Sequence, residues 1–135
     1  MNVTQGLRRA LQINPNGLAV ICGDRRQTWQ QVGERVARLA AGIRSLGARD
    51  GDRVAILSLN SDRYLELYLA AGWSGTVIVP LNIRWSALEN EDAMRDCRAD
   101  IPGKGKGGSL IAFTPDAHLS DVPVNILKLE KGHLA

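Results

Sequence analysis

Two short apolar runs, separated by the length of a helix, constrain the fold of this chain most. Residues Val54 to Leu57 and Thr76 to Val79 are rich in β-branched and aliphatic side chains, and Pro80 closes the second run. Two strands joined by a helix favour a parallel pair with a right-handed crossover. The sequence therefore predicts the beginning of an α/β sheet.

The segment between the two runs has the signals of that helix. Ser61 is a candidate N-cap, and Gly75 follows as a stop. Leu65, Leu69 and Trp73 recur between them at helical spacing. We expect one strand-helix-strand unit over residues 51 to 84.

A second helix is predicted before the first apolar run. Thr28 and Gln31 have the spacing of a capping box, a cap typically worth about 1 kcal/mol, and Gly47 supplies a left-handed stop. The apolar positions in between form one stripe: Val32, Val36, Leu39, Ala40, Ile43 and Leu46. This pattern indicates an amphipathic helix with one buried face.

Two elements are predicted ahead of that helix. Residues 4 to 13 have the periodicity of a short amphipathic helix. Leu18 to Cys22 and Gln27 to Trp29 flank Gly23-Asp24, which is typical of a β-hairpin. The chain is thus expected to begin with a helix and a hairpin.

A fourth helix is predicted after the second apolar run. Ser86 and Glu89 repeat the spacing of a capping box. They open a helical pattern that runs through Leu88, Ala93 and Cys97. The expected order is helix, hairpin, helix, strand, helix, strand, helix.

The composition changes near residue 100. All thirteen Arg lie at or before Arg98, whereas all four Lys lie after residue 100. Residues 102 to 109 read PGKGKGGS, a Gly-rich stretch with the character of a linker. We therefore divide the chain into residues 1–100 and an atypical tail of residues 101–135. Two explanations of the tail are open, a divergent natural C-terminus or a frameshift, fusion or truncated reading frame. The composition favours the second explanation.

The tail still contains two apolar segments. Leu110 to Phe113 and Val122 to Leu127 are apolar enough to form strands. Pro115 and Pro123 are expected to confine these strands to sheet edges or to short pieces.

Three motifs in residues 1–100 resemble the N-terminal end of the adenylate-forming superfamily, whose members include acyl-CoA synthetases, aryl-CoA ligases and luciferases. GDRRQTWQQV, from Gly23, is similar to the first core motif of that family, and GARDGDRVAILSLNS, from Gly47, to its strand entry. AAGWSGTVIVPLNIRWSALE, from Ala70, resembles the second core motif, in the form found in acyl-CoA ligases. The resemblance implies a partial N-terminal subdomain of α/β class: a short parallel-sheet unit flanked by helices and preceded by a helix and a hairpin.

The resemblance also implies a reaction for the complete enzyme. A carboxylate attacks the α-phosphate of ATP to give an acyl-adenylate and pyrophosphate, and the thiol of CoA then displaces AMP to give the acyl-CoA. The complete enzyme would use ATP, magnesium and CoA. Such chemistry needs a Gly/Ser/Thr-rich loop that wraps the triphosphate with backbone N–H groups. The family loop runs close to T-S-G-T-T-G-x-P-K-G, and no segment of this sequence matches it. We therefore expect no catalytic residue, no cofactor and no adenylation for this chain alone.

Arg84 is the one candidate cofactor-binding residue. It stands at the Arg of the Pro-Leu-Asn-x-Arg pattern of the family, where the resemblance implies an approach to the phosphates of CoA in some CoA ligases. A guanidinium group suits bidentate contact with phosphate. The alternative is a surface arginine paired with Glu89 or Glu91. Asn60 is expected to be a helix-entry residue.

Several other functions are not indicated. The net charge is +3, and the basic residues are not concentrated in one stretch of the sequence. The aromatic residues are expected to pack in the core: Trp29, Tyr64, Tyr68 and Trp73. Nucleic-acid binding is therefore not expected. Cys22 and Cys97 lack the spacing of metal ligands, and both are expected to be reduced core residues. No stretch approaches the roughly 20 apolar residues of a membrane span, and no apolar leader region is present, so the chain is expected to be cytosolic.

Two hypotheses from different classes follow. The first is a fragment of an ATP-dependent acyl-CoA ligase that is inactive by itself, whose complete form takes a carboxylic acid and CoA. The second is a non-catalytic α/β binding or interaction module built on that scaffold, and a weaker third is a split enzyme completed by another chain. A partial unit exposes surface that a larger domain would cover, so self-association through apolar side chains is also expected.

Overall fold

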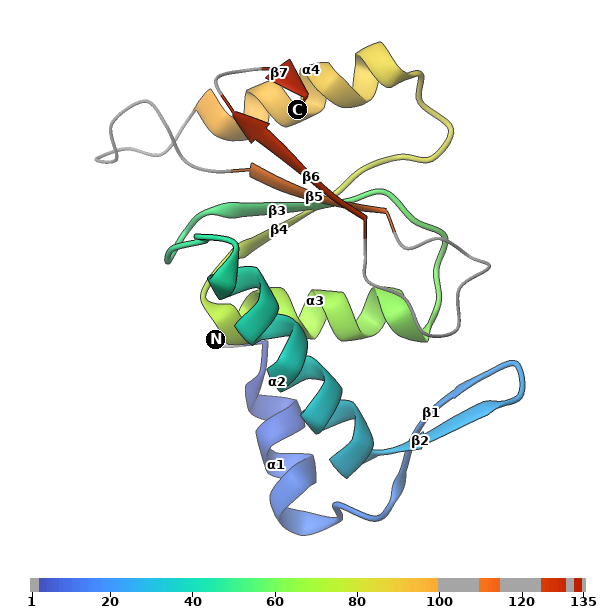
Figure 1. Cartoon of the computed structure of the whole chain (residues 1–135). Helices are drawn as coiled ribbons and strands as arrows, with labels where there is room; N and C mark the ends of the chain where they lie inside the picture. Colours follow the sequence, from blue (N-terminus) through green and yellow to red (C-terminus); the bar gives the residue numbers. More distant parts are fainter. Residues whose placement is uncertain (1–2, 100–109, 115–124, 131–132, 135) are drawn as a thin grey trace.

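A mixed sheet organises the chain. In this computed structural model, which describes residues 3–99, 110–114, 125–130 and 133–134, five strands follow the order β4-β3-β5-β6-β7 (Figure 1). The strands are β3 (Arg53–Ile56), β4 (Val77–Pro80), β5 (Leu110–Thr114), β6 (Asn125–Glu130) and β7 (His133–Leu134). β3 pairs in parallel with both β4 and β5, and β6 is antiparallel to its neighbours. The predicted parallel pair is confirmed.

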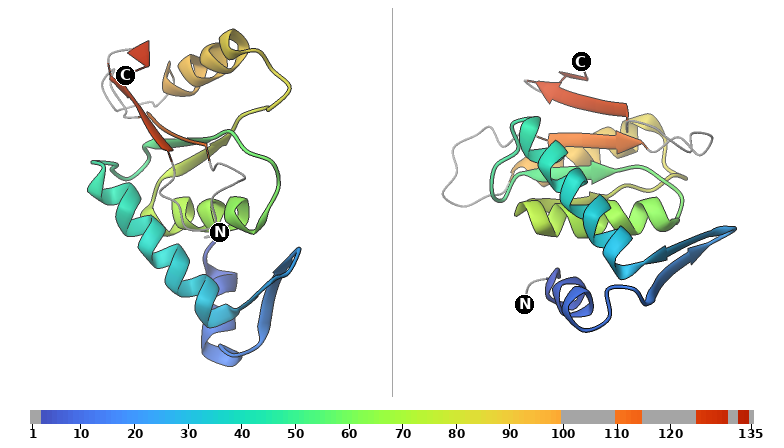
Figure 2. Two further views of the ribbon diagram at one scale, coloured as in Figure 1. Left: turned by 45° about the vertical axis from the view of Figure 1, so that its right-hand side comes forward. Right: turned by 60° about the horizontal axis from the view of Figure 1, so that its bottom comes forward.

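Helices cover both faces of the parallel strands. α2 (Trp29–Ser45) and α3 (Asp62–Ser74) lie on one face, and α4 (Ala87–Ala99) lies on the other (Figures 1 and 2). Because side chains alternate along a strand, Val54 and Ile56 of β3 join the core formed with α2 and α3. Ala55 points to the other face, where it packs with Met94 of α4. Coverage on both faces explains why Val54, Ala55 and Ile56 of β3 are all apolar and buried.

A helix and a hairpin precede this layered unit, as the sequence predicts. α1 (Gln5–Ile13) packs against α2, where the side chain of Leu11 lies directly over Gly33. β1 (Leu18–Cys22) and β2 (Arg25–Thr28) form the antiparallel hairpin, which lies on the same side of the sheet as α1, α2 and α3 (Figure 2). Gly23 turns the hairpin with φ +57°, a conformation that glycine adopts without steric cost.

The predicted helix boundaries are confirmed by their caps. Thr28 and Gln31 form a reciprocal capping box at the start of α2. The Ser61 hydroxyl accepts from the N–H of Tyr64 at the start of α3, at 3.2 Å. Gly47 and Gly75 follow α2 and α3 with φ of +91° and +78°, which is the left-handed conformation of a helix stop.

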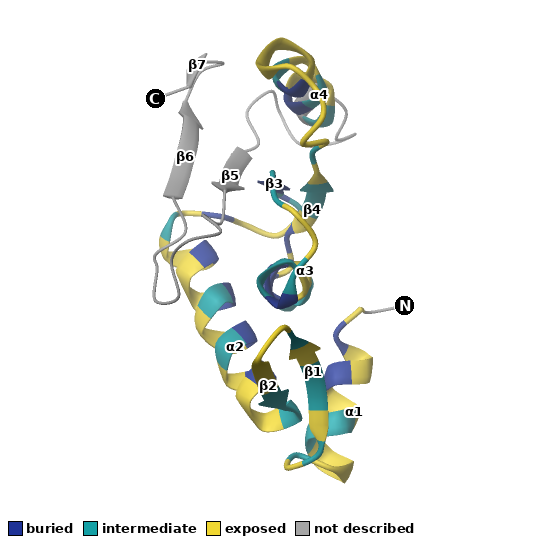
Figure 3. Cartoon of the chain, turned by 90° about the vertical axis from the view of Figure 1, so that its right-hand side faces the viewer, coloured by how far each residue is buried: buried dark blue, intermediate teal, exposed yellow. Residues whose placement is uncertain are grey.

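The buried stripes differ in part from the predicted ones. In α2, Val32, Val36, Ala40 and Ile43 are buried as predicted, with Leu39 and Leu46 half-buried. In α3 the buried face carries Leu67 together with small and acidic residues: Asp62, Glu66, Ala70, Ala71 and Ser74 (Figure 3). Leu65 and Tyr68 are exposed, as is Leu88 of α4. The prediction for Leu65 and Tyr68 was wrong, because the fully buried face of α3 follows Glu66, Leu67, Ala70 and Ala71, and only Leu69 and Trp73 of the predicted stripe pack against the core.

Both apolar segments of the tail contribute strands, the second at a shifted position. β5 covers the predicted Leu110 to Phe113 and adds Thr114, and it is short but internal, between β3 and β6. β6 overlaps the second segment and begins at Asn125. The predicted linker of residues 102–109, together with Pro115 and Pro123, lies outside the described residues.

Candidate functional site at the sheet edge

The carboxyl ends of three parallel strands meet at one edge of the sheet. β3 ends at Ile56, β4 at Pro80 and β5 at Thr114, and the loops that follow β3 and β4 leave from this edge (Figure 1). In open α/β sheets ligands usually bind at such an edge. The candidate site is therefore the loop of residues 81–86, which we call the edge loop, with the neighbouring loop of residues 57–61.

The edge loop is a tight turn fixed at its base. The N–H of Leu81 donates to the carbonyl oxygen of Ile56 at 2.8 Å, which continues the pairing with β3. Asn82 accepts twice: its side-chain Oδ1 from the N–H of Arg84 at 2.9 Å, and its carbonyl oxygen from the N–H of Trp85 at 3.1 Å. The turn thus projects residues 83–85 away from the sheet.

The capping box of α4 closes the loop. The Glu89 carboxylate accepts from the backbone N–H and the hydroxyl of Ser86, both at 2.8 Å, and the N–H of Glu89 donates back to that hydroxyl at 3.3 Å. The backbone hydrogen bond from Ser86, with the one from its hydroxyl, lowers the pKa of Glu89 below its ordinary value. The predicted capping box is confirmed.

Arg84 is exposed at the tip of this loop. Within the described part of the chain its guanidinium group forms no ion pair: Glu89 is engaged by Ser86, and Glu91 pairs with Arg95 at 2.6 Å. The pairing considered as the alternative for Arg84 is therefore not present. Ile83 and Trp85 on either side are 49% and 45% exposed, so the loop offers a cation between two apolar side chains.

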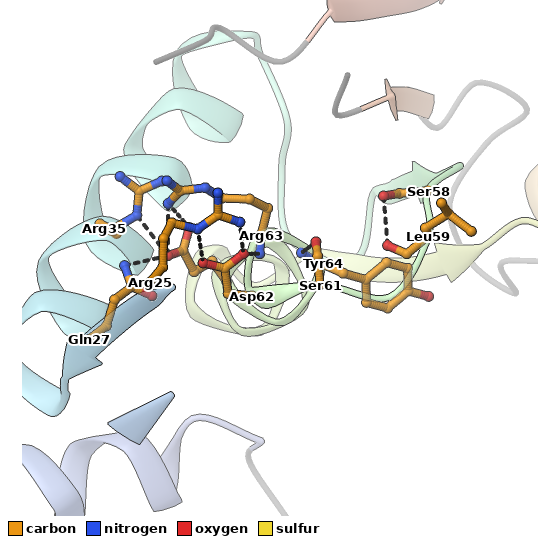
Figure 4. Close-up of polar contacts among 10 residues, drawn as sticks. Arg25, Gln27, Arg35, Ser58, Leu59, Ser61, Asp62, Arg63 and Tyr64 are labelled. Carbon is orange, nitrogen blue, oxygen red and sulfur yellow. Dashed lines mark hydrogen bonds and ion pairs between the residues drawn. The ribbon is translucent and has the colours of Figure 1, made fainter. Parts of the chain in front are cut away.

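A second polar arrangement lies at the start of α3. Asp62 is 3% exposed and receives two hydrogen bonds from Arg25 of the hairpin, at 2.8 Å from Nε and 2.7 Å from Nη2 (Figure 4). Burial by itself raises the pKa of Asp62, but the hydrogen bonds and charge of Arg25, assisted by Arg63, outweigh it and hold that pKa below the ordinary value. The same contacts raise the pKa of Arg25.

Glu66 lies one turn further along α3 and is 1% exposed. Its carboxylate accepts from Arg35 Nε of α2 at 2.7 Å, from Arg63 Nη1 at 3.2 Å and from Gln27 Nε2 of β2 at 3.1 Å. The two carboxylates therefore join the hairpin, α2 and the N-terminal end of α3. This buried network fixes where α3 starts, and with it the loop that follows β3.

Comparison with known proteins identifies the family. The model of the AMP-binding enzyme family matches residues 7–101. The chain belongs to the AMP-binding enzyme family. The resemblance stated from the three sequence motifs is thus confirmed, and so is the α/β fold class.

Several relatives of this AMP-binding chain are CoA ligases or synthases. A feruloyl-CoA synthase from Amycolatopsis sp is 40% identical over 110 residues, which cover 82% of this chain and 20% of that protein. A 2-succinylbenzoate–CoA ligase from Arabidopsis thaliana is 40% identical over 93 residues, which cover 69% of this chain and 17% of that protein. The N-terminal domain of FACL13 from Mycobacterium tuberculosis superimposes with a TM-score of 0.68 at 32% identity, over 72% of this chain and 25% of that chain. The AMP-binding chain spans about a fifth of the length of these relatives.

Sequence reasoning found Arg84 but missed the buried acids of the AMP-binding chain. The sequence predicts no role for Asp62 or Glu66, although their i, i+4 spacing continues into Ala70 and Ser74 on the same face. That continuation was the available signal. Asn60 is exposed and immediately precedes the N-cap Ser61, as expected of a helix-entry residue.

The remaining expectations concern the aromatic residues, the cysteines and metals. Trp29, Tyr64 and Trp73 pack against the core as predicted. Cys22 and Cys97 are free thiols and are half-buried. In the described ranges no cluster of His, Cys, Asp or Glu fits a metal ion, and none of the helices there is long and apolar enough to cross a membrane.

Proposed function

We propose that this chain forms the N-terminal part of the α/β domain of an ATP-dependent acyl-CoA ligase. The observation that carries the proposal is the AMP-binding match over residues 7–101, together with relatives that are CoA synthases and ligases at 40% identity. The complete enzyme would take a carboxylic acid, ATP and CoA. None of the described residues is assigned to magnesium, because no suitable ligand cluster occurs among them.

On this proposal the 135-residue chain alone does not activate a carboxylate. The sequence contains no counterpart of the phosphate-wrapping loop, and backbone donors of that kind are what stabilise the transferring phosphate. We expect no ATP–pyrophosphate exchange by the purified chain with a panel of aliphatic and aromatic acids. Exchange above the level of a heat-denatured control would contradict the proposal, and exchange that appears only with a second chain would support a split enzyme.

Arg84 is proposed to contact the phosphates of CoA. Its support is position and availability: the guanidinium group is exposed, unpaired within the described residues and placed at the carboxyl edge of the parallel strands. In a CoA titration by calorimetry, we expect Arg84→Ala to weaken binding roughly tenfold, the effect of losing one charged hydrogen bond. Arg95→Ala is the matched control, since Arg95 is an exposed arginine on α4 that already pairs with Glu91.

Pantetheine, which has no phosphate groups, separates a phosphate contact from any other. The Arg84 variant should bind pantetheine as the unchanged chain does. Equal CoA affinity of Arg84→Ala and the unchanged chain would refute the role of Arg84. CoA binding without exchange by any combination of chains would favour the non-catalytic binding module instead.

Three expectations from the sequence stay predictions. They are the cytosolic location, the division of the chain after residue 100, and self-association through exposed apolar side chains. The last is supported by a group of such side chains around the candidate site: Leu59, Ile83, Trp85 and Leu88.

A further inference from the structure

Asn90 connects α4 to the edge loop in an unusual way. It lies in the first turns of α4 and is 6% exposed. Its side-chain Nδ2 donates to the carbonyl oxygen of Asn82 at 3.2 Å and to that of Trp85 at 3.4 Å. An amide NH₂ group has two hydrogens, so a single side chain holds both ends of the turn that carries Arg84.

The other half of this amide indicates that Asn90 is not placed for packing. Its Oδ1 is buried and finds no hydrogen-bond partner among the described residues. Burying an unpaired amide oxygen is unfavourable, whereas a leucine has a similar size and carries no such cost. What Asn90 supplies, and leucine does not, is the pair of hydrogen bonds to the turn.

We propose that Asn90 is the positioning residue for Arg84, holding the turn so that the guanidinium group meets the phosphates of CoA. This inference rests on the proposed function of Arg84. The turn keeps two other supports, the Asn82 side chain and the Ser86–Glu89 capping box. Loss of Asn90 is therefore expected to loosen the tip of the loop without unfolding α4.

A double-mutant cycle on the full 135-residue chain tests the coupling. We expect Asn90→Leu to weaken CoA binding roughly three- to tenfold, the effect of one or two neutral hydrogen bonds, and to leave pantetheine binding unchanged. Because Asn90 acts through Arg84, the double variant Asn90→Leu/Arg84→Ala should bind CoA as weakly as Arg84→Ala and no more weakly. Additive losses would overturn the inference, as would wild-type affinity of Asn90→Leu.

Amide hydrogen exchange tests the contact without any ligand. The N–H of Trp85 is bonded to Asn82 across the turn, whereas the N–H of Ser86 is bonded to Glu89 in the cap. In Asn90→Leu the Trp85 amide should exchange roughly three- to tenfold faster, for the loss of the same hydrogen bonds, while the Ser86 amide and those of β3 keep their rates. Asn90→Ala serves as the second variant, and the melting temperature of each variant verifies that it is folded.

The CoA titration and the hydrogen-exchange measurement test separate claims. A wild-type chain that binds CoA no better than pantetheine refutes the proposed function of Arg84. Unchanged exchange of the Trp85 amide in folded Asn90 variants refutes the positioning contact itself, whatever the CoA titration shows.

Discussion

The buried carboxylate of Glu66 is expected to be the most sensitive polar group in the described part of the chain. Replacing Glu66 by alanine leaves three donors without their acceptor: Arg35, Arg63 and Gln27. Removing one partner of a fully buried ion pair costs about 3–5 kcal/mol. Here the side chains of Arg35 and Arg63 are 39% and 26% exposed, so water recovers part of the loss. We therefore expect Glu66→Ala to lower the free energy of unfolding by about 2–3 kcal/mol.

Thermal and urea denaturation measure this loss. For a chain of this size each kcal/mol corresponds to roughly 3–5 °C, so the melting temperature should fall by about 6–15 °C. Glu66→Gln retains an acceptor and should lose roughly half as much. Glu91→Ala is the matched control, because its pair with Arg95 is a single i, i+4 contact on α4, and it should change stability by less than about 0.5 kcal/mol. A loss for Glu66→Ala no larger than that of Glu91→Ala would refute the assignment of the network as a structural clamp.

Two further predictions concern stability. The pKa of Asp62 is lower in the folded chain than in an unfolded one, so ionised Asp62 stabilises the fold above the unfolded pKa of about 3.9, and this stabilisation is lost as pH falls through the folded pKa. In urea titrations, the free energy of unfolding should therefore fall less between pH 6 and pH 3 for Asp62→Asn than for the unchanged chain. Equal falls would contradict the pairing with Arg25. On α2, the Cβ of Gly42→Ala meets no atom within 4 Å, so this variant should raise the free energy of unfolding by up to about 1 kcal/mol. The Cβ of Gly33→Ala would come within 2.8 Å of the Leu11 side chain, and this close contact should cancel the gain. A melting temperature that rises equally in both variants would show that α1 does not pack as described.

The parts of the fold that the sequence predicts well are those set by neighbouring residues. Thr28 with Gln31, Ser61, and Gly75 act within one helical turn, so their roles are written in the local sequence and the structure confirms them. The parallel pair of β3 and β4 follows from the length and character of one strand-helix-strand unit. The position of Arg84 at the carboxyl edge of the sheet is a direct consequence of that topology.

The parts that the sequence does not predict depend on which helix meets which. Leu65 has the spacing of a core residue and is 41% exposed. The buried face of α3 is rotated from the predicted stripe toward Glu66, Ala70 and Ala71. Leu69 and Trp73 of that stripe remain half-buried against the core. Asp62 and Glu66 then become buried at its end, and burial of acids is acceptable only when distant partners such as Arg25 neutralise them.

The edge loop shows how such long-range contacts combine with local ones at a functional surface. Asn82, within the motif Pro-Leu-Asn-x-Arg, and the Ser86–Glu89 box just after it shape the turn by local hydrogen bonds. Asn90 adds a contact from inside α4 that the motif does not contain, and it places an uncompensated amide oxygen in the interior to do so. The side chain of Asn90 is unfavourable for packing, and its two hydrogen bonds hold the two ends of one exposed turn. The simplest explanation is that the turn carries the guanidinium group of Arg84, which Asn90 positions.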